Sequence, residues 1–138
     1  MKKLAFLPKK ATIITIILFI FSCGESVKKA PEINPEFGQY ISAFTSGIVS
    51  KQSTIVIQLA TDYYKPVQKG SEVEVSLFDF DPSIDGKAYW QDAHSIEFVP
   101  EEMLESGKVY DGEFRLSKLL NVPDEFSTFP FQFKTIQQ

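Results

Sequence analysis

The sequence predicts an all-β fold: an immunoglobulin-like antiparallel sandwich of about seven short strands, preceded by a signal peptide. Short runs in which apolar and polar residues alternate recur through residues 37–138, as strands with one buried face require. Turn signals separate these runs at the spacing that is typical of sandwiches. The chain is 43% hydrophobic and contains 13 phenylalanines, so it can bury a substantial core.

The N-terminus has the features of a signal peptide. Basic residues open the chain at Lys2 and Lys3 and recur at Lys9 and Lys10, and an apolar run of twelve residues follows at 11–22. A helix that spans a bilayer needs about 20 apolar residues, so this run suits a cleaved leader better than a stable anchor. We therefore assign residues 1–22 to the signal peptide.

The cysteine that ends this run is the predicted lipidation site. The sequence Ile20-Phe21-Ser22-Cys23-Gly24 resembles the signal of bacterial lipoproteins, in which the cysteine after a small residue receives lipid. That resemblance implies an exported lipoprotein of the bacterial cell envelope, anchored in a membrane through Cys23 and facing the periplasm or the cell surface. Acyl chains on Cys23 anchor a protein through about 0.8 kcal/mol per buried CH₂. The alternative is an ordinary signal anchor with an incidental cysteine.

A short polar segment separates Cys23 from the predicted domain. Residues 23–36 contain two prolines and charges of both signs, which favours a tether. The β-sandwich is predicted over residues 37–138.

The first half of the domain contains three of the expected strands. Residues 40–45 suit an edge strand, and a turn follows at 45–47. Residues 53–60 alternate clearly, and residues 72–80 alternate with valines facing inward and acids outward. Residues 61–66 are expected to form a loop, and residues 69–70 another turn.

The centre of the sandwich is predicted between residues 88 and 116. The expected strands are 87–90, 94–99 and 108–116; Pro100 ends the second because it has no N–H to donate to a ladder. A last strand is expected at 129–135, and helical turns are possible only at 100–107 and 116–120. The predicted core residues are Trp90, Ile96, Phe98, Tyr110 and Phe114.

Charge and cysteine content exclude several kinds of site. The first 22 residues hold four lysines and no acid, so the rest of the chain has 10 basic and 18 acidic residues, a net charge of −8. No basic stripe exists to displace the counterions of nucleic acid. One cysteine and one histidine supply neither an intrachain disulfide nor a structural zinc site. No metal and no cofactor are expected.

Asp81 and Asp85 lie in a segment that superficially resembles a calcium loop. Pro82 directly follows Asp81, the third acid is displaced from its position in a calcium loop, and no helices are expected to flank the segment. A turn between strands is therefore the favoured interpretation. Asp81 and Asp85 are retained as candidate ligand contacts.

The sequence does not predict an enzyme. His94 has no Gly-x-Ser-x-Gly motif to partner it, so it is expected at the start of a strand. Four acids, at positions 97, 101, 102 and 105, are expected on a strand face and a loop, where carboxylates are solvated rather than paired for catalysis.

Loop aromatics are the other candidate ligand contacts. Tyr63 and Tyr64 lie in the predicted loop, and with Tyr89 and Trp90 they have the composition of a carbohydrate-stacking platform. We expect Trp90 to be a core residue instead, since a buried tryptophan is common in sandwiches.

Several motifs resemble those of a known family. They are Ile41–Gly47, Ser53–Leu59, Phe80–Trp90 and a pattern of an aromatic-x-Pro, a leucine and Gly-x-x-Tyr that runs from Phe98 to Tyr110. They are similar to the N-terminal, macroglobulin-like domain of bacterial alpha-2-macroglobulin-family lipoproteins, especially those of Bacteroidota. They are also similar to bacterial immunoglobulin-like modules. The first family implies large protease-trapping proteins, but this chain has no cysteine after Cys23 and hence no thioester.

Two functions follow as expectations. The first is a lipid-anchored, non-catalytic module from the front of a macroglobulin-like protein, with proteases or further domains of a longer chain as partners. A chain that stops on its last strand suggests such an architecture. The alternative is a stand-alone envelope lipoprotein that binds glycan or protein through Tyr63 and Tyr64.

Overall fold

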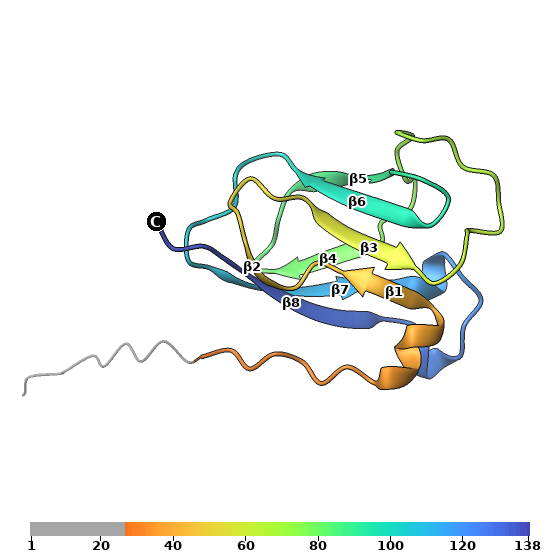
Figure 1. Cartoon of the computed structure of the whole chain (residues 1–138), viewed down its shortest axis with the longest axis horizontal. Coiled ribbons are helices and arrows are strands. Elements are labelled where there is room, and N and C mark those ends of the chain that lie inside the picture. Colours follow the sequence, from red (N-terminus) through yellow and green to blue (C-terminus); the bar gives the residue numbers. More distant parts are fainter. Residues whose placement is uncertain (1–26) are drawn as a thin grey trace, which may run out of the picture.

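The computed structural model describes residues 27–138, and the predicted signal peptide and Cys23 lie outside this range. Eight strands form two four-stranded sheets that face each other, and no α-helix occurs in the described range (Figure 1). The all-β, immunoglobulin-like sandwich is therefore confirmed. The strands are β1 (Ile41–Phe44), β2 (Gly47–Val49), β3 (Ile55–Leu59), β4 (Phe78–Asp81), β5 (Gly86–Trp90), β6 (Ser95–Pro100), β7 (Val109–Phe114) and β8 (Phe129–Thr135).

The strand order is β1-β3-β6-β5 in the first sheet and β2-β8-β7-β4 in the second. Every pair of neighbours is antiparallel except β2 and β8, which are parallel. The predicted antiparallel sandwich therefore contains one parallel pair. Gly47 has a φ of +71°, which lets the chain cross from the first sheet to the second and continue as β2.

Alternation in the sequence corresponds to burial on the central strands. Ile55, Ile57 and Leu59 on β3 are at most 2% exposed and face the second sheet. The five predicted core residues are all buried, with exposed fractions of 6% or less. Burial of apolar surface on both inner faces is therefore the main stabilising term of the fold.

Phenylalanines of β8 supply much of the second sheet's inner face. Phe129, Phe131 and Phe133 are each 1% exposed and follow one another along the strand with nearly parallel rings. Gly112 on β7 lies directly beneath the ring of Phe131 and leaves room for it. The last predicted strand, 129–135, is confirmed, and its three phenylalanines share one face, as the alternation predicts.

The predicted strand at 72–80 is wrong over most of its length. Only Phe78–Asp81 forms a strand, and residues 60–77 form a long loop. Leu77 is buried and Phe78 also packs against the core, so two successive side chains face inward and a period of two cannot continue through them. The loop still protects the edge of β5, because Gly70 and Val73 donate backbone hydrogen bonds to Trp90 and Ala88.

Three 3₁₀-helices complete the described chain. They are η1 (Pro35–Gln39), η2 (Leu116–Lys118) and η3 (Asp124–Phe126). The predicted helical turn at 116–120 is confirmed by η2, whereas residues 100–107 form turns without a helix. The side chain of Asn34 caps η1 by accepting a hydrogen bond from the backbone N–H of Glu36.

Candidate functional site

The loop of residues 60–70 lies against the turn that joins β5 to β6. The backbone N–H of Tyr63 donates to the carbonyl oxygen of Ala93 across 2.7 Å, and Gly70 donates to Trp90 across 2.7 Å. These bonds place Tyr63 on Trp90, with the ring centroids 5.1 Å apart and the planes 23° from parallel. The loop lies at the end of the sandwich opposite the C-terminus (Figure 1), so the stack of Tyr63 on Trp90 belongs to that end.

Tyr63 and Tyr64 occupy different environments. Tyr64 meets Tyr63 edge to face at 4.7 Å, and Tyr64 is 69% exposed. Burial raises the pKa of Tyr63, whereas the hydrogen bond with Tyr63 lowers the pKa of Tyr64. Tyr63 therefore packs against the core, and the exposed ring of Tyr64 is the one that a ligand can reach. The Nζ of Lys65 lies 5.3 Å from the Tyr64 centroid, a cation–π contact.

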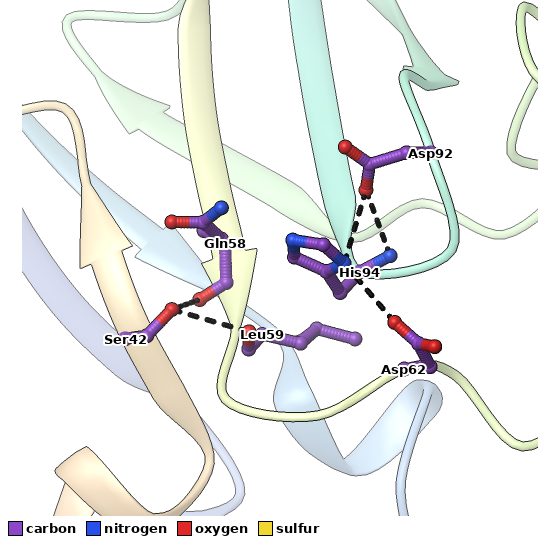
Figure 2. Close-up of polar contacts among 6 residues, drawn as sticks. All are labelled: Ser42, Gln58, Leu59, Asp62, Asp92 and His94. Carbon is purple, nitrogen blue, oxygen red and sulfur yellow. Dashed lines mark hydrogen bonds and ion pairs between the residues drawn. The ribbon is translucent and has the colours of Figure 1, made fainter.

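A histidine and two carboxylates gather beside this stack. The Nδ1 of His94 lies 3.1 Å from the Oδ1 of Asp62 and 3.4 Å from the Oδ1 of Asp92 (Figure 2). The backbone N–H of His94 also donates to Asp92 across 2.9 Å, and this bond lowers the pKa of the Asp92 carboxyl. His94 directly precedes β6, which begins one residue later than the strand start predicted at His94.

Sequence reasoning missed this cluster. The spacing of Asp92 and His94 was a usable signal, because an Asp side chain often accepts from the backbone N–H two residues later. Asp62 is 32 residues from His94, so no local pattern reveals their contact.

The serine that follows His94, Ser95, is 4% exposed and hydrogen-bonds through its side chain to Asp92. Ser42 on β1 is drawn with the cluster, but its hydroxyl donates to the carbonyl oxygen of Leu59 across 3.1 Å, on the β1 side of β3 (Figure 2). A hydroxyl held in this way is an anchor for the β1–β3 pair. The arrangement of His94, Asp62 and Asp92 can orient an imidazole and accept hydrogen bonds from a ligand.

Asp81 and Asp85 lie at the other end of the sandwich. β5 begins at Gly86, next to Asp85, and ends at Trp90 beneath Tyr63. Asp81 pairs with Lys28, and the carbonyl oxygen of Asp85 accepts from the N–H of Glu101 across 2.8 Å. The four predicted ligand contacts therefore do not form one site.

The acidic residues are likewise divided between two places. Glu97 lies on the outer face of the first sheet, where it accepts a hydrogen bond of 2.6 Å from the hydroxyl of Thr54. Glu101, Glu102 and Glu105 line a hollow of about 240 Å³ together with Asp85. Within residues 27–138 no three acidic, histidine or cysteine side chains are grouped so as to hold a metal ion. The same residues contain no helix long and apolar enough to cross a membrane.

Comparison with known proteins identifies the fold alone. No family model and no curated protein matches the chain. The fold is similar to part of an L,D-transpeptidase from Mycobacterium tuberculosis H37Rv, with a TM-score of 0.50, 13% identity and coverage of 72% of this chain and 41% of that chain. Two structures of L,D-transpeptidase 3 from Mycobacterium tuberculosis, one of them in complex with a faropenem-derived adduct, have TM-scores of 0.48 and 14% identity. They match 72% of this chain and 39% and 38% of theirs. The match thus spans less than half the length of each of these proteins.

Proposed function

We propose that this chain is a lipid-anchored, non-catalytic β-sandwich module of the bacterial cell envelope that forms the front of a macroglobulin-like protein. One observation carries the proposal. The residues that resemble the macroglobulin-like family have architectural positions in the fold: they end strands, fill the core or close loops. A sequence signature of this kind specifies a module rather than a reaction.

The pattern from Phe98 to Tyr110 illustrates this role. Phe98 is 6% exposed and Leu104 is 5% exposed, so the strand before the loop at 100–107 and the middle of that loop are both held in the core. Gly107 has a φ of +65°, a conformation that favours glycine. The N–H of Lys108 and the carbonyl oxygen of Glu105 both bind the hydroxyl of Thr135, which is fully buried.

The segment from Phe80 to Trp90 is architectural in the same way. Phe80 and Trp90 are 8% and 6% exposed. Gly86 lies so close to the carbonyl oxygen of Val99 and the ring of Phe98 that a Cβ at this position would clash with both. Glycine there permits β5 to pair closely with β6, and its replacement would disturb the sheet.

Labelling with lipid tests the anchor. A bacterial host is grown with an alkyne analogue of palmitate, and the full chain is isolated and coupled to a fluorophore. We expect wild type to be labelled and to sediment with membranes, and Cys23→Ala to lose both properties. A Ser42→Ala chain, altered in the domain only, should behave as wild type. Equal labelling of wild type and Cys23→Ala would remove Cys23 as the anchor.

Ligand binding at the aromatic end is a second candidate function, favoured by the exposure of Tyr64 on a fixed support. A ring that is 69% exposed yet held by Tyr63, which itself stacks on Trp90, loses little entropy when a sugar or a peptide stacks on it. A glycan array probed with the purified chain tests this role. A specific glycan retained by wild type and lost by Tyr64→Ala, but not by Tyr89→Ala on β5, would support it.

A further inference from the structure

Residues 28–34 lie along the outer face of the second sheet instead of extending into solvent (Figure 1). The Nζ of Lys28 lies 3.2 Å from a carboxylate oxygen of Asp111 and 3.3 Å from one of Asp81. The side-chain amide of Gln132 donates to the carbonyl oxygen of Lys29 across 3.3 Å. Hydrogen bonds to Asp111 and Asp81 raise the pKa of Lys28, as these ion pairs favour the protonated amine.

The receiving groups form one row across three strands. Asp81 on β4 is the register partner of Asp111 on β7, and Asp111 is the partner of Gln132 on β8. Gln132 also donates to Asp111 across 2.8 Å, which holds that carboxylate toward Lys28. Lys28 therefore binds two carboxylates whose positions are fixed by the strands β4 and β7.

Apolar contacts continue the attachment beyond the charged row. Ile33 packs against the hydrophobic core, and Pro31 is partly buried. With Ala30 they form one side of an apolar groove of about 390 Å³, whose other side includes Phe44 and Ile48. We call residues 28–34 the strap. It is bound to the sheet at both of its ends, by ion pairs at Lys28 and by packing at Ile33.

The two ends of the strap lie at opposite ends of the sandwich. Lys28 is at the end where the C-terminus lies, because its partner Asp81 closes β4 there (Figure 1). The strap leads into η1, and the carbonyl oxygen of Tyr40 after η1 accepts from Ala60, at the start of the loop that carries Tyr63 and Tyr64. A seven-residue strand such as β8 spans about 20 Å. The strap therefore moves the point where the tether leaves the domain by about that distance, from the η1 end of the sandwich to the Lys28 end.

This reversal decides which end of the domain lies near a membrane. Four residues lie between Cys23 and Lys28, so the five Cα-to-Cα steps that join them reach at most about 18 Å. A free segment would instead attach the domain at Phe37, beside the Tyr64 end, through 14 Cα-to-Cα steps that reach about 50 Å when extended. The strap therefore shortens the free tether and places the opposite end of the domain near the membrane.

We propose that the strap orients the anchored domain, so that the Asp85 and Glu101 end faces the bilayer and the Tyr64 end points away from it. This inference rests on the proposed anchoring through Cys23. It gives the acidic row of Asp81 and Asp111 a specific function, which is to bind the chain's own Lys28.

Paramagnetic broadening in a membrane measures this orientation. The lipidated full chain, labelled with ¹⁵N, is inserted into nanodiscs that contain a lipid with a gadolinium chelate on its headgroup. We expect the amide signals of residues 101–105 to broaden several-fold more than those of residues 62–65. Stronger or equal broadening at residues 62–65 would overturn the proposed orientation.

Two charge reversals test the role of Lys28. Lys28→Glu places a third carboxylate beside Asp81 and Asp111, so the strap should detach and the excess broadening at residues 101–105 should disappear. Lys65→Glu makes the same change of charge at the far end and should keep the wild-type pattern. If Lys28→Glu keeps it too, Lys28 does not hold the strap. A wild-type chain that never enters the nanodiscs would instead reject the lipid on Cys23, and with it the orientation that depends on that lipid.

Discussion

The backbone N–H of Glu105 donates a hydrogen bond to the hydroxyl oxygen of Tyr110 across 3.1 Å. Tyr110 is 4% exposed, so its ring lies in the core while its hydroxyl reaches back to the loop that precedes β7. The Gly-x-x-Tyr part of the family-like pattern thus closes the loop at 100–107. Its function in the module is structural.

Replacement of Tyr110 by phenylalanine tests this closure. The variant keeps the ring but leaves the Glu105 N–H without its acceptor, so the free energy of unfolding should fall by about 1–2 kcal/mol. Urea denaturation followed by circular dichroism measures the change. Tyr64→Phe, at an exposed ring, should unfold at the wild-type urea concentration. An unchanged Tyr110→Phe midpoint would mean that the loop does not depend on this bond.

A methyl group at Gly112 should destabilise the second sheet. The added Cβ would lie against the ring of Phe131, well inside van der Waals contact, and that ring is buried among other aromatics. Overpacking of this kind costs about 1–3 kcal/mol. Gly38→Ala is the matched control, because no atom lies within 4 Å of the new methyl group. Equal thermal midpoints for the two variants would contradict the packing described for β7 and β8.

The stacking of Tyr63 on Trp90 has a fluorescence signature. Trp90 is the only tryptophan of the chain, so its emission reports this one position. Tyr63→Ala should uncover the indole and shift its emission to longer wavelength, whereas Tyr64→Ala should leave the spectrum unchanged because Tyr64 contacts Tyr63 and not Trp90. A red shift in both variants, or in neither, would show that Tyr63 does not cover Trp90.

The bond between Asp92 and the His94 backbone should make stability depend on acid pH. The pKa of Asp92 is lowered in the folded state, so its ionised form stabilises the fold above the ordinary carboxyl pKa of about 3.9. That contribution is lost as the pH falls through the folded pKa. Asp92→Asn should therefore flatten the decline of the unfolding free energy below pH 4.

His94→Gln separates the backbone bond from the imidazole. This variant keeps the N–H of residue 94, so most of the acid dependence should remain when urea midpoints are compared from pH 2 to pH 6. Loss of the dependence in His94→Gln, together with its survival in Asp92→Asn, would assign it to the side chain instead.

Much of the fold is predictable because it depends on local alternation. β3 and β8 each bury every second residue, and on β6 the buried Ile96 and Phe98 alternate with Glu97 and Val99, so that period is visible in the sequence. Trp90 and Tyr110 are predictable as core residues for a related reason, since large aromatics next to alternating strands are costly to expose.

The features that escaped prediction depend on distant partners. Residues 72–77 alternate as a strand would, yet they form a loop because Leu77 and Phe78 both pack inward. β2 is three residues long and exists through its parallel pairing with β8, which is more than 80 residues later in the chain. The strap and the pairing of Asp62 with His94 are likewise set by tertiary contacts, and no residue pattern encodes them.

The size of the native protein tests the proposed function most directly. An antibody raised against residues 37–138 is used to probe membrane fractions of the source organism by immunoblot, with a strain that lacks the gene as control. We expect a membrane-bound band many times larger than this chain, as the front module of a macroglobulin-like protein requires. A membrane-bound band of the size of the domain alone would contradict that proposal and leave a small lipoprotein, with ligand binding at Tyr64 as its function.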